Sequence, residues 1–190
     1  TLFVARHGQS ETNNQRLVTG QLDPSLTAKG VEQSHQLARL LASEPLAAVY
    51  TSALARTKQT ASPTARMHGL ESICLPELNE IRMGVLQGRH RDERDPEAAA
   101  LWQQWQDAMW RYCVPGAESF AELHQRVAKA LARILTQHQG ETVLIVGHSA
   151  TNRILLGTLL ALPKEQWPGL RPSNKTLHRV TLCDERPAQH

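Results

Sequence analysis

Two histidines stand where short apolar runs end, and their positions suit phosphoryl chemistry. Residues 2–5 run into Arg6-His7-Gly8, and residues 142–146 run into Gly147-His148-Ser149. In open parallel α/β sheets, ligands bind beyond the carboxyl ends of the strands, so both rings are expected in one pocket. A neutral imidazole can attack phosphorus without a separate base, and an arginine fork pairs with two phosphoryl oxygens at once. The pattern therefore predicts phosphoryl transfer.

Two further groups would complete such a site. Arg56 opens the helix expected after the second strand, where it would hold the phosphoryl group together with Arg6 and, if it is protonated, His148. A poor leaving group also needs a proton. Glu80 could supply this proton and later accept one from water, because it opens an irregular segment over the pocket. On spacing alone, Glu77 is an equal candidate.

The elements that must position these residues alternate along the chain. Further strands are expected at residues 47–50, 72–75 and 176–182. Helices are expected from a Thr27 cap to Leu41, from Ala53 through Thr60 with a bend or a fresh start at Pro63, from about Pro96 to Arg111, from Ser119 to beyond Ile134, and from Ala150 to about Leu162.

This alternation predicts an α/β fold, a three-layer α/β/α sandwich with a mostly parallel central sheet. At 190 residues the chain is expected to form a single domain, residues 1–190. Residues 77 to about 116 show no clean strand signal. They are expected to form an insertion, or lid, over the carboxyl ends of the strands.

Composition excludes several classes of protein. The net charge of +3 is mild and no basic stripe carries interleaved aromatics, so nucleic acid is not an expected partner. No run approaches the roughly 20 apolar residues of a membrane span, and the first strand follows no signal-like region. Cys74, Cys113 and Cys183 form no CxxC pair, which argues against disulfides and zinc. We expect a cytoplasmic protein without metal or cofactor.

Five segments in order resemble the histidine phosphatase superfamily, the phosphoglycerate-mutase-like fold. They are Arg6-His7-Gly8-Gln9-Ser10 with Asn13, residues 50–56 ending at Arg56, Leu78-Asn79-Glu80 with Gly84 and Gly88, residues 115–119, and residues 146–149. The likeness runs from Phe3 to about Leu182. It implies that His7 is the nucleophile, that Arg6, Arg56 and His148 hold the phosphoryl group, and that Glu80 rather than Glu77 is the proton donor. It further implies substrate or phosphate contacts at Asn13, Thr19, Gly20 and the Ser149 backbone.

Members of this family either release the phosphoryl group to water or return it to substrate. Three features favour a phosphatase over a mutase. The chain is shorter than family mutases, Met83 stands where those mutases carry a tyrosine, and between Arg94 and Gly116 only Arg111 could replace their arginine pair. The expected substrate is a small phosphorylated metabolite. A mutase, or a domain that binds phosphorylated ligands without catalysis, is the alternative reading.

The insertion carries the features that would choose the substrate. Trp102, Trp105 and Trp110 can serve as core or interface packing, or as an apolar wall beside the phosphate. Four arginines, Arg82, Arg89, Arg91 and Arg111, could each reach a second anionic group or remain solvated. His90 is retained as a pocket candidate. The natural substrate and the oligomeric state stay open, although dimers are common in the family that the chain resembles.

Overall fold

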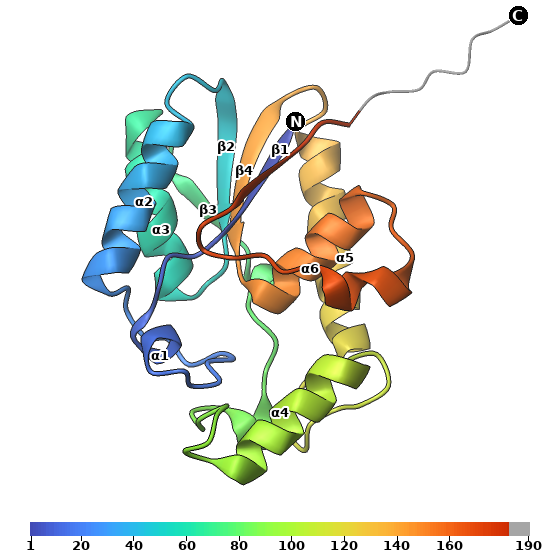
Figure 1. The fold of residues 1–190 in the computed structure, drawn as a ribbon. Coiled ribbons are helices and arrows are strands. Elements are labelled where there is room, and N and C mark those ends of the chain that lie inside the picture. The colour runs from blue at the N-terminus through green and yellow to red at the C-terminus, as the bar shows by residue number, and fades with distance from the viewer. Residues whose placement is uncertain (183–190) are drawn as a thin grey trace, which may run out of the picture.

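Five strands form one mixed sheet at the centre of the molecule (Figure 1). The structure is a computed structural model that describes residues 1–182, so Cys183 lies outside it. The strands are β1 (Leu2–Arg6), β2 (Leu46–Thr51), β3 (Ser72–Cys74), β4 (Thr142–Gly147) and β5 (Leu177–Val180), in the spatial order β3-β2-β4-β1-β5. All pairings are parallel except that of β5 with β1. The predicted, mostly parallel sheet is confirmed.

Register places the two histidines at the same level of the sheet. Strands β1 and β4 are neighbours, and their pairing runs from Leu2 opposite Val143 to Arg6 opposite Gly147. Each strand is followed directly by a histidine, His7 after β1 and His148 after β4. Their rings consequently meet, with centroids 5.2 Å apart.

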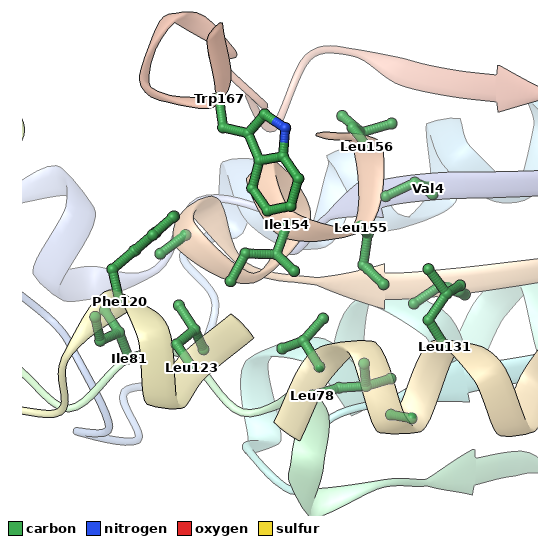
Figure 2. Close-up of a cluster of buried hydrophobic side chains, with 14 of the residues drawn as sticks. Val4, Leu78, Ile81, Phe120, Leu123, Leu131, Ile154, Leu155, Leu156 and Trp167 are labelled. Carbon is green, nitrogen blue, oxygen red and sulfur yellow. The ribbon is translucent and has the colours of Figure 1, made fainter. Parts of the chain in front are cut away.

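Helices cover both faces of the sheet, as the three-layer prediction requires. Helices α2 (Ala28–Leu40) and α3 (Ala55–Met67) lie on one face, and α5 (Phe120–Gln137) and α6 (Ser149–Leu159) lie on the other (Figure 1). Figure 2 shows the second interface, where Val4 of β1 meets side chains of α5 and α6. Alternate residues of each strand point to opposite faces, so Val4 packs on this side and Phe3 on the other.

Local signals account for most helix starts. The Thr27 hydroxyl accepts a hydrogen bond from the Gly30 amide at 3.1 Å, which caps α2. Ser119 and Glu122 form a reciprocal capping box at the start of α5. The apolar residues of α5 that recur at helical spacing are fully buried: Phe120, Leu123, Val127, Ala130, Leu131 and Ile134. On α2, by contrast, Leu37 and Ala38 are buried but Val31 is exposed.

Of the two alternatives at Pro63, a bend or a fresh start, helix α3 excludes the fresh start. The helix continues through this proline to Met67. A proline within a helix removes its own hydrogen bond to the residue four positions earlier, here Gln59. Ala61 and Ala65, on either side of Pro63, are buried against the sheet in the core that α2 shares. We attribute the unbroken helix to this packing, which outweighs one lost hydrogen bond.

The segment between β3 and α5 forms the expected insertion. It contains two 3₁₀ helices, η1 (Pro76–Leu78) and η2 (Gly84–Leu86), and α4 (Pro96–Ala108), capped by the Asp95 side chain. Figure 1 shows α4 beyond the sheet, on the side where β1 and β4 end. Trp105 and Met109 join it to the core on the α5 side. Among the described residues, no helix is long and apolar enough to cross a membrane.

Candidate active site

His7 is held so that one ring nitrogen is free to attack. Its Nδ1 lies 2.7 Å from the Gly8 carbonyl oxygen. A carbonyl only accepts hydrogen bonds, so Nδ1 carries the hydrogen and Nε2 carries the lone pair. The Nε–H of Arg56 donates to this Nε2 at 3.3 Å. Nε2 of His7 is therefore the ring nitrogen that keeps a lone pair, as a nucleophile would require.

The free site keeps the His7 imidazole neutral. Burial lowers the pKa of His7 well below its usual value, and the charges of Arg6 and Arg56 lower it further. The hydrogen bond to Gly8 opposes this shift. The pKa of His148 is also lowered well below its usual value, first by burial and then by Arg56 and His7. Both rings therefore keep a lone pair at neutral pH.

His148 is oriented by a hydroxyl of the neighbouring strand end. Its Nε2 lies 2.8 Å from Ser52 Oγ, which in turn contacts Thr57 Oγ1 at 2.9 Å. The buried Nδ1 of His148 has no hydrogen-bond partner among residues 1–182. When Ser52 donates to Nε2, the one hydrogen of the neutral ring is at Nδ1, where it can be donated to an oxyanion.

Two guanidiniums lie beside His7. Arg56 is fully buried, and its Nη1 and Nη2 donate to the carbonyl oxygens of Leu22 and Gly20. Arg6 donates from Nη1 to the Pro172 carbonyl at 3.3 Å, while its buried Nε has no partner in the described chain. Burial lowers the pKa of both, that of Arg56 to about 10. Both remain charged at neutral pH, so the site is prepared for an anion.

Glu80 reaches the site from the insertion. Its carboxylate accepts hydrogen bonds from the amide of Ala150 at 3.2 Å and from that of Thr151 at 3.3 Å. These amides belong to the first turn of α6, so the carboxylate lies at a helix N-terminus, where negative charge is favoured. Glu77 instead faces Arg133, 3.7 Å away, and does not line the cavity. The structure thus separates two residues that spacing alone could not.

These groups surround a cavity of about 260 Å³. Among the residues that line it are Arg6, His7, Thr19, Gly20, Arg56, Glu80 and Ser149. Asn13 is not a lining residue, because its side chain bonds the Ser10 amide and Thr19 Oγ1. His148 does not line the cavity either, although its ring lies next to that of His7, which does.

The cavity lining distinguishes the candidates that the insertion offered. Trp102, Trp105 and Arg91 belong to this lining. Trp110 does not, and packs edge-on against Phe120. His90 does not line the cavity. The remaining arginine candidates do not line it either, namely Arg82, Arg89 and Arg111. Arg89 is paired with Asp95 and Glu97, both at 2.7 Å.

Sequence reasoning missed four residues. Gln106, Arg153 and Arg171 line the cavity, and Arg126 donates a hydrogen bond to the carbonyl oxygen of Glu80 at 3.1 Å. Arg153 had a usable signal, since it follows Ser149 by four residues and thus shares its helix face. The others depend on how distant segments meet. Within residues 1–182, no group of three or more His, Cys, Asp or Glu side chains is arranged to hold a metal ion.

Comparison with known proteins places this geometry in a family. The family model described as "Histidine phosphatase superfamily (branch 1)" matches residues 2–190. A Yersinia enterocolitica relative named "Probable phosphoglycerate mutase GpmB" is 37% identical over 183 residues, which cover 94% of this chain and 83% of the relative.

Two solved structures show the same fold. The alpha-ribazole phosphatase from Shigella flexneri superposes with a TM-score of 0.82 at 28% identity, covering 93% of this chain and 87% of that one. A mycobacterial glucosyl-3-phosphoglycerate phosphatase in complex with VO3 gives a TM-score of 0.82 at 26% identity, covering 90% and 85%.

Proposed function

The chain belongs to the histidine phosphatase superfamily (branch 1), and we propose that it is a metal-independent phosphomonoesterase. It would act on a small phosphorylated metabolite through a phosphohistidine at Nε2 of His7. The observation that carries this proposal is the fixed tautomer of His7, whose Nδ1–H is bound to Gly8 and whose Nε2 faces Arg56. A neutral imidazole with a directed lone pair, between buried guanidiniums, suits attack on a phosphate ester.

In the first step, Nε2 of His7 forms a bond to phosphorus while the ester P–O bond breaks. Arg6 and Arg56 neutralise the charge that develops on the three equatorial oxygens. The Nδ1 of His148, which is buried outside the cavity lining and has no partner among residues 1–182, would supply a further donor once a bound phosphoryl oxygen lies within its reach. The leaving alkoxide takes a proton from the carboxyl group of Glu80, because a poor leaving group cannot depart as an anion.

In the second step, water attacks the phosphohistidine. The Glu80 carboxylate, left without its proton by the first step, accepts a proton from this water. The Nε2–P bond breaks, inorganic phosphate leaves, and His7 returns to its neutral state. The same carboxyl group thus serves as acid and then as base.

Two observations support hydrolysis over phosphoryl return to the substrate. Met83 is buried and lines the cavity at the position where family mutases carry a tyrosine. Arg111, which alone could replace the mutase arginine pair, does not line the cavity. The two structural neighbours described above are phosphatases by name. A mutase is the second candidate, because the Yersinia relative bears that name.

The test is phosphate release from a panel of phosphomonoesters, with EDTA present throughout. The panel includes para-nitrophenyl phosphate, phosphoglycerates, α-ribazole phosphate and sugar phosphates. We expect release without added metal, and abolition of turnover in His7→Ala with the fold retained. The exposed His35→Ala serves as the matched control and should be as active as the wild type.

The intermediate is tested separately by acid quench and alkaline quench of enzyme mixed with ³²P-labelled substrate. A phosphohistidine is labile to acid and stable to alkali, so label should stay on the protein only after alkaline quench. Near-normal turnover by His7→Ala would refute the covalent mechanism. Interconversion of phosphoglycerates without phosphate release would instead establish the mutase.

A further inference from the structure

Side chains of two helices hydrogen-bond the backbone that follows His7. The Gly8 N–H donates to Oγ1 of Thr60 on α3 at 2.9 Å. The Gln9 N–H donates to Oε1 of Gln33 on α2 at 2.8 Å. This second N–H belongs to the same peptide group as the Gly8 carbonyl, which lies 2.7 Å from Nδ1 of His7 and accepts its hydrogen. Gln33 and His7 therefore bind opposite sides of one peptide group, which we call the Gly8–Gln9 peptide.

The first turns of α2 bring Gln33 to this peptide. Gly30 lies so close to the chain after β1 that a Cβ at this position would overlap the carbonyl oxygen of Gln9. Gln33 follows Gly30 by three residues, and residues three apart lie on the same face of a helix. The side chain of Gln33 is half-buried, and its Oε1 is the side-chain atom that can accept from a backbone N–H. The close approach of α2 thus places an acceptor at the peptide.

Gln33 lies outside the cavity in which the substrate is expected. It does not line the cavity that His7 and Glu80 share. It borders a second cavity of about 60 Å³ instead, together with Gly8 and Thr60. Any effect of Gln33 on the reaction must therefore pass through the backbone that it binds.

Two properties of a peptide group connect Gln33 with the imidazole. The group is planar, so a hydrogen bond that holds its N–H also fixes the direction of its carbonyl. Hydrogen bonds that follow one another in a chain polarise each other, which makes the carbonyl a stronger acceptor. The chain here runs from Nδ1–H of His7 through the peptide to Oε1 of Gln33. Because the bond made by one ring nitrogen sets the state of the other, this chain secures the lone pair at Nε2.

The proposed attack on phosphorus would make this chain of hydrogen bonds stronger. As Nε2 of His7 shares its lone pair with phosphorus, the ring keeps its Nδ1 hydrogen and becomes cationic. When water releases the phosphate, the bond electrons return to Nε2 and the ring is neutral again. A hydrogen bond from a cationic donor is stronger than one from a neutral donor. The Gly8 carbonyl would therefore stabilise the transition state more than the free enzyme, which raises kcat.

We propose that Gln33 is a positioning residue for the nucleophile. It holds the Gly8–Gln9 peptide so that the carbonyl of this peptide fixes the Nδ1 hydrogen of His7 and stabilises the ring when it becomes cationic. This inference rests on the proposed function, because it concerns the nucleophile of that reaction. It assigns Gln33 no contact with the substrate.

Two substitutions at Gln33 separate the acceptor oxygen from the shape of the side chain. Gln33→Met has a similar length but no acceptor for the Gln9 N–H. We expect phosphohistidine formation, followed as nitrophenolate release in a single turnover of para-nitrophenyl phosphate, to slow about tenfold, the effect of one hydrogen bond. The inhibition constant of inorganic phosphate should stay at its wild-type value, because Gln33 lies outside the cavity. Gln33→Glu keeps an acceptor oxygen and should restore the rate to within about threefold of the wild type.

Gln36→Met is the matched control for Gln33→Met. It makes the same change at the next turn of α2, beside the same small cavity. The amide of Gln36 is exposed and donates to Oε1 of Glu32 at 3.1 Å, rather than to the chain after β1. The single-turnover rate of this variant should equal that of the wild type.

The Nδ1 proton of His7 gives a readout that does not depend on turnover. The stronger the hydrogen bond of this proton, the further downfield it resonates in the NMR spectrum of the free enzyme labelled with ¹⁵N at histidine. Its signal is identified by its absence in His7→Ala. We expect the signal to move upfield in Gln33→Met and to keep its wild-type position in Gln36→Met. Lower stability alone would not move it, because only folded molecules contribute to the signal.

The outcomes separate this inference from the proposed function. An unchanged single-turnover rate in Gln33→Met would overturn the positioning role and leave the phosphatase intact. A slower rate with an unmoved Nδ1 proton, or without recovery in Gln33→Glu, would show a structural role only and overturn it as well. If the wild type releases no phosphate from any ester, the phosphatase fails and the Nδ1 proton decides alone. Movement in Gln33→Met but not in Gln36→Met then supports the positioning of His7, and no movement overturns it.

Discussion

One hydrogen bond decides which nitrogen of His7 keeps its lone pair. The Gly8 carbonyl takes the hydrogen of Nδ1, and this leaves the Nε2 lone pair directed toward the buried Arg56. In the proposed mechanism the attack therefore needs no additional base. Its remaining requirement is a proton for the leaving group, which we propose that Glu80 supplies.

The loss of turnover caused by replacing Glu80 should depend on the leaving group of the substrate. Glu80→Gln keeps the shape and one acceptor oxygen but removes the transferable proton. We expect turnover of alkyl phosphates to fall by at least about a hundredfold, the usual contribution of general acid–base catalysis. With para-nitrophenyl phosphate the loss in the first step should be far smaller, because nitrophenolate departs without protonation. Equal losses of phosphohistidine formation with both ester types, measured in a single turnover, would remove Glu80 from the acid role.

Among the elements, α5 positions the acid-bearing segment although it contributes nothing to the cavity lining. One guanidinium, that of Arg126, donates to the carbonyl oxygens of Glu77 and Asn79 at 2.7 Å. It also donates to the Glu80 carbonyl and forms an ion pair with Glu118 at 2.6 Å. Arg126 is therefore a positioning residue for Glu80.

Arg126→Gln should weaken both the fold and proton transfer. The nearly buried Glu118 carboxylate loses its partner, and breaking such a pair costs about 3–5 kcal/mol of unfolding free energy. Displacement of Glu80 should lower kcat for alkyl phosphates more than for para-nitrophenyl phosphate. Unfolding in urea and the ratio of the two kcat values measure these effects.

The control for this variant is Arg133→Gln on the same helix. Arg133 faces Glu77 at 3.7 Å in a solvent-exposed pair, which should contribute at most about 1 kcal/mol. If Arg126→Gln changed stability but left the ratio of kcat values at the wild-type value, its role would be structural only.

The contact between α2 and the segment after β1 needs two glycines. A Cβ at Gly8 would lie 2.5 Å from the carbonyl oxygen of Gly30, and a Cβ at Gly30 would overlap the carbonyl oxygen of Gln9. The first turn of α2 thus lies directly against the backbone that carries His7. Any side chain there would push the nucleophile out of place.

Gly30→Ala tests this contact, and the sign of the effect is diagnostic. Within a helix, alanine is favoured over glycine by about 1 kcal/mol. Overlap with the Gln9 backbone should reverse this sign and destabilise the protein by about 1–3 kcal/mol, with reduced turnover. Gly169→Ala is the control, since a Cβ there meets nothing within 4 Å. A stabilised Gly30→Ala protein would contradict the close approach.

At the scale of the whole molecule, the site stores positive charge and two neutral imidazoles in the interior. Five arginines line the cavity against the single carboxylate of Glu80. Folding must therefore remove these charged and polar groups from water, which costs free energy of desolvation. A bound anion should offset part of that cost. The stability of the free protein should consequently depend on pH in a direction that the histidines determine.

Stability should fall as the pH is lowered from about 6.5 toward the folded-state pKa values of His7 and His148. Both pKa values are lowered in the folded state, so the unfolded chain binds more protons in this window. Each imidazole then contributes a slope of up to about 1.4 kcal/mol per pH unit. Urea unfolding at several pH values measures the slope. His7→Ala removes one imidazole and should lower it, and an unchanged slope would contradict a buried neutral His7.

The sequence by itself determined the features that contiguous residues encode. Apolar runs that end in His7 and His148 indicate the edge of the sheet at which parallel strands place their ligand-binding residues. The Thr27 and Ser119 caps indicate where α2 and α5 begin. The apolar spacing of α5 predicted which of its faces is buried. Such signals depend on neighbours within a few positions of the chain, so they survive without a tertiary structure.

Only the tertiary structure decided which distant side chains meet. It kept α3 continuous through Pro63, where buried neighbours outweigh one lost hydrogen bond. It also brought Arg171 and Gln106 together across 65 positions of the chain. The physical reason is that these contacts arise from packing of the insertion and the β5 approach against α6, which no local periodicity or cap encodes.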